Sequence, residues 1–170
     1  LDPEERLRFY HLLAELAAGP GAILSVSLST VDEGLAAVFE PGAASPARRL
    51  ELLERARAAG VPTGVYLLPV LPGVSDSAEQ IDKALSACAR AGASFVQFGG
   101  MTLRPGRQRE HFLQILRGHD AECADCVAEM YGDDRYGHPQ KAVYGEQNER
   151  FVPAAARHSM PTRMPSDLFG

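Results

Sequence analysis

Short apolar runs alternate with helix-like segments over residues 1–105 of the chain. Apolar side chains recur at helical spacing within residues 3–18, 31–39, 46–59 and 77–91. Runs typical of strands occupy residues 22–30, 60–76 and 93–98. Each connection between strands contains a helix, which predicts right-handed βαβ units and a parallel sheet. Three strands cannot close a barrel, so we expect either a small open sheet or part of a larger βα array.

Residues 60–76 form a near-continuous apolar stretch with helical segments on both sides, which is typical of a buried parallel strand. Pro62, Pro69 and Pro72 mark where the ladder of backbone hydrogen bonds is expected to begin and stop. Ser75-Asp76 then offers an N-cap for the next helix. Because α/β proteins bind ligands beyond the carboxyl ends of their strands, we expect a binding site near the end of this stretch.

Polar residues and glycines mark where the predicted helices begin and end. Side chains that accept a backbone N–H are expected to begin helices at Asp2, at Thr30 or Asp32, and at Ser45 before Pro46. Glycine is expected to end helices at residues 19–21 and at Gly92.

The C-terminal third does not continue the alternation of helices and strands. Helical patterns cover residues 107–116, 120–130 and 140–157, and a turn rich in glycine and aromatic residues spans 131–139. A proline-rich tail at residues 160–165 is expected to be extended. The predicted fold class is α/β, with about three parallel strands and their helices in residues 1–105 and a helical extension in 106–170.

Composition narrows the classes of function. With 170 residues, 45% of them hydrophobic, the chain can bury a core, so we exclude disorder of the whole chain. A net charge of −5 argues against a general nucleic-acid or anionic-membrane binder, although a local basic patch stays possible. We find no signal peptide and no membrane-spanning run, and three cysteines do not match a secreted disulfide framework. We therefore expect a cytoplasmic protein; Leu1, set within a helical pattern, suggests a fragment.

The strand at residues 22–30 alternates apolar side chains with serine, so one face of it is small and polar. Two interpretations stay open. The strand is either an edge strand with a solvated face, or part of a barrel in which Ser25, Ser27 and Ser29 point into a ligand-filled interior.

Arg48 and Arg49 lie in the first turn of the helix that begins at Pro46. The helix dipole disfavours cations there, by about 0.3–1 kcal/mol each. Either the pair is solvated or ion-paired with Glu40 or Glu51, or one arginine faces an anionic ligand.

His119, Cys123 and Cys126 lie at i, i+4 and i+7, which would place all three on one helix face. They could share a zinc ion with His111 or His138 as a fourth ligand, or simply form a half-buried helix face. The second interpretation is the stronger one, because structural zinc sites commonly use a knuckle turn, and we assign no metal ligand.

The other sequence patterns indicate no catalytic or binding site. Cys88 is expected to be a small buried hydrophobe, and Asp133-Asp134 a solvated turn. There is no phosphate-binding glycine loop, nucleophile elbow or zinc-protease motif. The residues by themselves predict an α/β ligand-binding architecture without a catalytic residue.

Three segments resemble the second half of a radical SAM domain. They are residues 25–32, 39–50 and 59–76, and a weaker similarity continues to about Pro105. The most similar group is the spore photoproduct lyase-like, or "DNA repair photolyase", branch. Residues 130–139 also resemble the C-terminal extension of that branch.

This resemblance implies a partial (β/α) barrel and reductive cleavage of S-adenosylmethionine at a [4Fe-4S] cluster, which starts radical chemistry on a substrate that we do not identify. The Cys-x-x-x-Cys-x-x-Cys motif that holds the cluster in this family is absent here, as is the family's amino-binding glycine motif. Cys123 and Cys126 lie in the wrong segment. We therefore expect the cluster ligands upstream of Leu1, in a missing N-terminal half of the barrel, and expect residues 1–170 alone to be inactive.

The resemblance also implies roles for a few residues. Ser27 and Ser29 match a strand end that contacts the ribose or methionyl part of the cofactor, and Arg49 matches a position suited to its carboxylate. The backbone from Val70 to Gly73 matches the strand end that passes the adenine.

Two other functions remain as alternatives: a non-redox half-barrel that binds a small molecule, and a zinc-stabilised interaction module built on the His119, Cys123 and Cys126 face. The acidic balance does not support a duplex-binding surface. Strand edges that the missing half should cover predict that the isolated chain self-associates.

Overall fold

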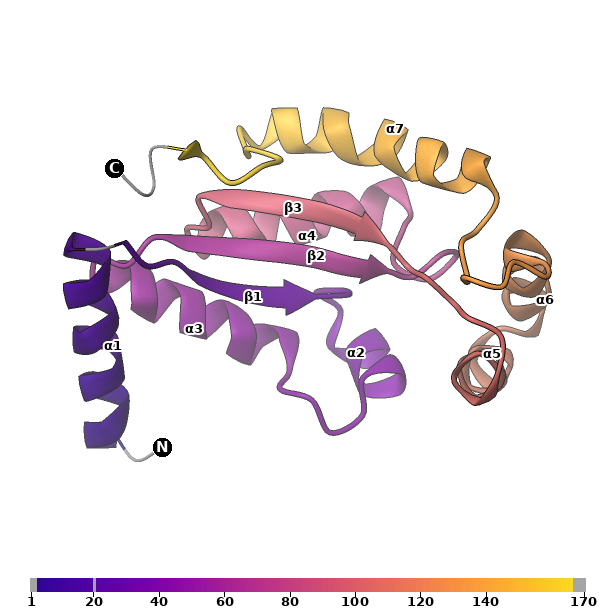
Figure 1. Cartoon of the computed structure of the whole chain (residues 1–170), viewed down its shortest axis with the longest axis horizontal. Helices are drawn as coiled ribbons and strands as arrows, with labels where there is room; N and C mark the ends of the chain where they lie inside the picture. Colours follow the sequence, from indigo (N-terminus) through magenta and orange to yellow (C-terminus); the bar gives the residue numbers. More distant parts are fainter. Residues whose placement is uncertain (1–2, 20, 167–170) are drawn as a thin grey trace.

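The computed structural model describes residues 3–19 and 21–166. Its elements run, in chain order, α1 (Pro3–Ala18), β1 (Leu24–Leu28), α2 (Glu33–Phe39), α3 (Pro46–Ala58), β2 (Thr63–Val70), α4 (Ala78–Arg90), β3 (Phe95–Gly100), α5 (Arg107–His119), α6 (Ala121–Tyr131) and α7 (Lys141–Arg157) (Figure 1). The predicted α/β class with three parallel strands is confirmed, as is the helical character of the C-terminal third. None of the described helices combines the length and apolar character needed to cross a membrane.

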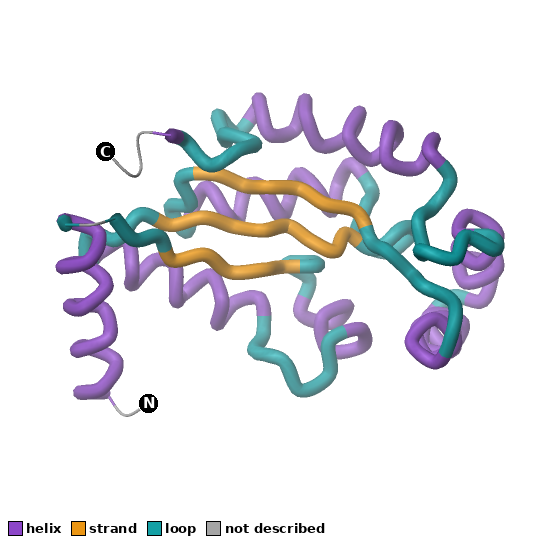
Figure 2. Tube along the Cα trace, viewed as in Figure 1, coloured by secondary structure: helices purple, strands orange, loops and turns teal. Residues whose placement is uncertain are grey.

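The three strands form one parallel sheet in the order β1-β2-β3 (Figure 2). The register pairs Val26 with Val65 and Val65 with Val96, so the apolar residues of neighbouring strands stand side by side. Pro69 does not end β2, which continues to Val70 with an irregular register after Leu67. Residues 71–76 lie outside the strand, which is therefore shorter than the apolar stretch that predicted it.

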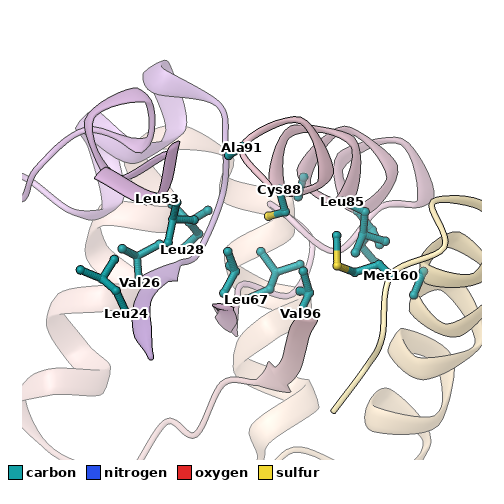
Figure 3. Packing of buried hydrophobic residues seen from close by; sticks show 14 of the residues in the cluster. Leu24, Val26, Leu28, Leu53, Leu67, Leu85, Cys88, Ala91, Val96 and Met160 are labelled. Carbon is teal, nitrogen blue, oxygen red and sulfur yellow. The ribbon is translucent and has the colours of Figure 1, made fainter. Parts of the chain in front are cut away.

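One face of the sheet is covered by helices. Leu24, Val26 and Leu28 alternate with exposed serines along β1, which confirms the predicted alternation and agrees with both the edge-strand and the barrel interpretation. Their face packs against α3 and α4, where Leu53, Leu85 and Cys88 are fully buried, and Figure 3 shows these side chains meeting those of the strands.

The opposite face of the sheet is largely open. Ser25, Ser27 and Gln97 on this face are exposed, and Leu68 is 37% exposed. Phe95 and its neighbour Gly64 on this face are buried. Parallel sheets are normally covered on both faces, whereas residues 3–19 and 21–166 cover only one face of this sheet.

The C-terminal extension packs across the carboxyl ends of the strands, where α5 and α6 form a second apolar cluster with the loops that leave β2 and β3 (Figure 1). Leu71, Leu103 and Leu116 are buried there. Tyr131 donates a hydrogen bond of 2.8 Å to the carbonyl of Met101, which ties α6 to the loop after β3. The α7 helix returns along α4 and β3.

Several predicted boundaries shift by one or two residues. Asp32, rather than Thr30, caps α2, and Ser45 caps α3 as predicted. The N-cap of α4 is Ser77 rather than Ser75 or Asp76.

The two displaced N-cap candidates are used elsewhere. The Ser75 hydroxyl and one Asp76 carboxylate oxygen accept N–H groups of Leu71 and Gly73, which close the turn after β2. The C-cap of α4 is Ala91, and Gly92 follows it with a positive φ of 81°. Asp2 and Pro20, which were expected to help start and stop the first helix, lie outside the described residues.

Candidate functional site

A cleft of about 520 Å³ opens at the carboxyl ends of the three strands, where the sequence predicts a ligand site. Its volume is typical of small-molecule sites, which span about 300–1,000 Å³. Its polar wall is made by the ends of β1 and α2 and the start of α3, with Ser27, Ser29, Glu40 and Arg49.

The remaining walls of the cleft are more apolar. The end of β2 and the residue after it contribute Leu68, Pro69 and Leu71, and the end of β3 with the loop after it contributes residues 100–103. Gln108 and Phe112 of α5 complete the rim, so the cleft takes side chains from both parts of the chain.

Arg49 organises the polar wall through three of its five N–H groups. Its Nη1 donates to the carbonyl of Ser27 at 2.8 Å, and its Nε donates to the carbonyl of Ala44 at 2.8 Å. Its Nη2 forms an ion pair of 2.5 Å with the carboxylate of Glu40. The guanidinium therefore joins the end of β1 to the loop before α3.

Glu40 receives charge-stabilising hydrogen bonds from both sides. Ser29 donates its hydroxyl to one carboxylate oxygen, and Arg49 donates to the other. Partial burial raises the pKa of Glu40, but the hydrogen bonds from Ser29 and Arg49 outweigh it, so the net effect is a pKa below the ordinary 4.5. Glu40 is thus an anion beside the cleft over the physiological pH range.

Of the two interpretations of the first-turn arginines, the ion pair with Glu40 is confirmed for Arg49. Arg49 also lines the cleft, and its contact with an anionic ligand stays a prediction. Glu51, the other candidate partner, pairs with Arg55 instead.

The structure brings together three of the five residues that the sequence assigned to a cofactor. Ser27, Ser29 and Arg49 line one wall of the cleft. Val70 is fully buried in the core, and Gly73 lies against the Cys123 side chain, so neither lines the cleft. Their roles beside a cofactor stay predictions.

Sequence reasoning missed the residues that approach the cleft from other elements. Glu40 follows the apolar Phe39, and Gln108 and Phe112 lie one helical turn apart on α5. The sequence did contain a signal for Glu40, because Glu40 was already a candidate ion-pair partner of Arg49. The positions of Gln108 and Phe112 depend on how α5 packs, which no local pattern encodes.

A partly buried polar cluster joins α7 to the turn after β2. Gln147 of α7 is 1% exposed and donates to the Asp76 carboxylate at 3.3 Å. Arg150 donates to the carbonyl of Asp76 at 3.1 Å. A Cβ on Gly100 would lie 2.4 Å from the Tyr144 ring, so glycine is required where α7 packs against the end of β3. These contacts hold α7 against the turn after β2 and the end of β3.

The proposed helix face with His119, Cys123 and Cys126 does not exist as a continuous surface. The chain breaks at Asp120, which ends α5 and caps α6, so His119 lies on a different helix from the cysteines. His119 packs edge-on against Phe39 instead. Among the described residues, no group of three or more histidine, cysteine or acidic side chains is arranged to hold a metal ion.

Comparison with known proteins finds relatives without a described function. The chain is 35% identical over 150 residues to the uncharacterized protein Rv2578c of Mycobacterium tuberculosis, and equally to Mb2609c of Mycobacterium bovis. Each match covers 88% of this chain but 43% of the relative. An uncharacterized protein, ORF301 of Acidianus two-tailed virus, is 33% identical over 97 residues, which is 55% of this chain and 32% of that protein.

The chain thus spans less than half the length of the curated relatives it matches. No family model matches the chain, and no solved structure matches it.

Proposed function

We propose that this chain is the second half of a radical SAM barrel and supplies one wall of an S-adenosylmethionine site. The complete protein would cleave that cofactor reductively at a [4Fe-4S] cluster and pass the radical to a substrate of unknown identity. The observation that carries the proposal is the cleft at the carboxyl ends of three parallel strands, in which Ser27, Ser29 and Arg49 meet.

The way in which helices cover the sheet supports the proposal that it is part of a barrel. Helices cover one face and leave the other open, as in a segment of a barrel wall whose inner side faces the lumen. The two edges also differ. The N–H of Val96 on β3 already donates to the carbonyl of Pro161 in the tail, whereas β1 is the other edge of the sheet. We place the first half of the barrel beside β1.

The side chains of the cleft suit S-adenosylmethionine, which has a charged amino-acid end and a planar adenine. The guanidinium of Arg49 would hold the carboxylate, and the Ser27 hydroxyl would bind the ribose or methionyl part. Leu68 and Met101 offer apolar surface to the adenine. When bound and reduced, the cofactor supplies a 5′-deoxyadenosyl radical; the chain's own contribution is to orient the cofactor and exclude water.

The cysteines of this chain do not fit an iron–sulfur cluster. Cys88 is buried in the core, while Cys123 and Cys126 lie on α6, outside the cleft lining. No described trio of thiols meets, so we assign the cluster to the part of a longer protein that precedes these residues. The chain's coverage of 43% of its mycobacterial relatives is compatible with such a part.

The first test is to read the coding sequence upstream of Leu1 for Cys-x-x-x-Cys-x-x-Cys, and to read the unmatched part of the mycobacterial relatives for the same motif. We expect it in both. An intact upstream reading frame without the motif removes the radical SAM function and favours the non-redox half-barrel as the second candidate.

The second test uses the protein of the full reading frame, reconstituted with iron and sulfide under anaerobic conditions. It should be brown and convert S-adenosylmethionine to 5′-deoxyadenosine when reduced. Arg49→Ala should weaken S-adenosylmethionine binding, measured by calorimetry, whereas Arg48→Ala, an exposed neighbour, should not. Equal affinity of the two variants would remove the carboxylate role of Arg49.

A further inference from the structure

Two free cysteines lie one turn apart near the start of α6, outside the lining of the cleft. Cys126 is exposed and Cys123 is partly buried. Residues three positions apart on a helix are neighbours on its surface, and their Cα atoms are about 5 Å apart. A disulfide requires a Cα separation of about 4.4–6.8 Å. The two thiols are therefore close enough to react with each other, whereas Cys88 is buried in the main core.

Cys123 is in contact with the turn that follows β2, and Figure 1 shows α6 beyond the carboxyl end of this strand. Its S–H donates a weak hydrogen bond of 4.0 Å to the carbonyl of Pro72. A Cβ on Gly73 would lie 2.5 Å from its sulfur, so the glycine makes room for the thiol. The turn begins with Leu71, which lines the cleft. Cys123 thus joins α6 to a segment that forms part of the cleft wall.

The two thiols differ in how readily they react. Burial, together with the charges of Asp120, Cys126 and Asp76, raises the pKa of Cys123, so this thiol is protonated at neutral pH. Cys126 is exposed to reagents in solution. Because a thiolate rather than a thiol attacks a disulfide, the reaction begins at Cys126. Cys123, one helical turn away, is then the thiol that completes it.

We propose that Cys123 and Cys126 form a reversible disulfide on reaction with a small uncharged disulfide, and that this bond withdraws Cys123 from the turn after β2. The Cys126 thiolate attacks one sulfur of the small disulfide, and the displaced thiolate takes up a proton. Cys123 then loses its proton and attacks the Cys126 sulfur, which displaces the second small thiolate. Overall, the two cysteines lose two electrons and two protons, and the small disulfide becomes two thiols.

The new bond requires a change in the first turn of α6. The Cβ atoms of residues three apart on a regular helix are about 5–6 Å apart, but a disulfide brings them to about 3.5–4.5 Å. The first turn is held by Asp120, whose side chain accepts the N–H of Cys123 at 2.9 Å and whose carbonyl accepts that of Ala124 at 3.1 Å. Drawing Cys123 towards Cys126 therefore disturbs this cap and removes the sulfur from Gly73. A bond that needs such a shift is easily reduced, which makes it reversible.

The experiment treats the native 170-residue chain with hydroxyethyl disulfide, followed by denaturation, alkylation with iodoacetamide and digestion with trypsin. This reagent is uncharged, because the carboxylates of Asp120 and Glu122 would repel an anionic disulfide. Both cysteines fall in one tryptic peptide, residues 118–135. Its mass should be lower by two hydrogen atoms, and it should carry no alkyl label. Neither thiol lines the cleft, so the test needs no cofactor.

Two variants separate the roles of the cysteines. Cys123→Ser should stop at the mixed disulfide on Cys126, because no second thiol displaces the small thiolate. Cys126→Ser should react at least about tenfold more slowly, because only the partly buried thiol remains on α6. Cys88 of the same chain is the internal control, and it should be recovered as an alkylated thiol in the wild type and in both variants.

Hydrogen exchange measures the change in α6. The backbone amides of residues 121–126 should exchange at least about tenfold faster in the oxidised chain than in the reduced chain, because the capped turn has opened. The amides of α4 should exchange at the same rate in both forms. Reduced glutathione should restore the slow exchange, since a strained disulfide does not resist reduction by glutathione as a structural one does.

Four results would overturn the proposal. The first is a stable adduct on Cys126 of the wild-type chain without the internal bond. The second is a disulfide that joins two chains instead of two residues of one chain. The third is a bond that forms only in urea. The fourth is equal exchange of residues 121–126 in the oxidised and reduced chains, because Cys123 would then keep its place against Gly73.

Discussion

The Nη2 atom of Arg49 lies 2.5 Å from the Glu40 carboxylate at the wall of the cleft, and the two side chains come from α3 and the end of α2. The side chain of Arg49 is 17% exposed and that of Glu40 is 27% exposed. This ion pair is partly shielded from water, and it also carries the hydrogen bonds that hold the end of β1 in place.

Replacement of Arg49 should therefore cost stability as well as any ligand contact. Arg49→Ala leaves the partly buried Glu40 without its cation and the Ser27 carbonyl without its donor, so we expect a loss of about 1–3 kcal/mol in the free energy of unfolding. Urea denaturation measures it. Arg48→Ala, at an exposed position, should change the value by less than about 0.5 kcal/mol. Similar losses for the two variants would show that the ion pair has no structural role.

The ion pair between Glu40 and Arg49 also predicts that the stability of the chain depends on pH. Because the pKa of folded Glu40 is lowered below 4.5, its stabilising contribution is present above that value and is lost as pH falls through the lower folded pKa. The stability difference between the wild-type chain and Glu40→Gln should thus shrink as pH falls from 7 to about 3. Denaturation in urea at several pH values follows this difference. A difference that stays constant across that range would contradict the lowered pKa.

Gly64 of the central strand should not tolerate a side chain. A Cβ at this position would lie 2.3 Å from two atoms of the Phe95 ring, which is fully buried. Gly64→Ala should therefore destabilise the chain by about 1–3 kcal/mol, and Phe95→Leu in the same chain should relieve part of the clash.

For a second glycine, Gly145, we expect the opposite effect of alanine on stability. Gly145 lies inside α7 with no atom within 4 Å of an added Cβ, so Gly145→Ala should stabilise the chain by about 0.5–1 kcal/mol. Thermal unfolding of both variants measures the contrast. Equal effects of the two substitutions would contradict the packing of Phe95 over β2.

The three cysteines should differ in reactivity towards a thiol reagent. Burial raises the pKa of Cys88 to about 12, so this thiol stays protonated and inaccessible at pH 8. Burial also raises the pKa of the partly buried Cys123, while Cys126 is exposed. Mass spectrometry after brief alkylation should find labelling in the order Cys126, Cys123, Cys88. Equal labelling in the native chain, rather than only in urea, would contradict this order.

The open edge of β1 predicts self-association of the isolated chain. Leu24 donates its N–H to the Pro62 carbonyl on the β2 side, so the N–H of Ser25 points to the outer edge. Ser25→Lys adds a charge to this exposed edge position and should reduce association, measured by sedimentation at increasing concentration. A wild-type chain that stays monomeric at high concentration would contradict the prediction.

The local order of elements was predictable because it depends on short-range periodicity and caps. The alternation of serine with apolar residues in β1, and Ser45 as the N-cap of α3, are visible without any tertiary contact. The helix–strand alternation then determines a parallel sheet, since each connection crosses from one end of the sheet to the other. The resemblance, rather than the local pattern, assigned Ser27 and Ser29 to a strand end, and both line the cleft.

Only the tertiary structure decided which side chains meet. Val70 follows the irregular register of β2 and points into the core, while Leu68 takes the place in the cleft. Gln108 and Phe112 reach the cleft because α5 packs across the strand ends, and Asp120 separates His119 from the two cysteines by ending one helix and starting another. Periodicity assigns a residue to a face of its own element, but the neighbours of that face depend on loop paths and packing between segments far apart in the chain.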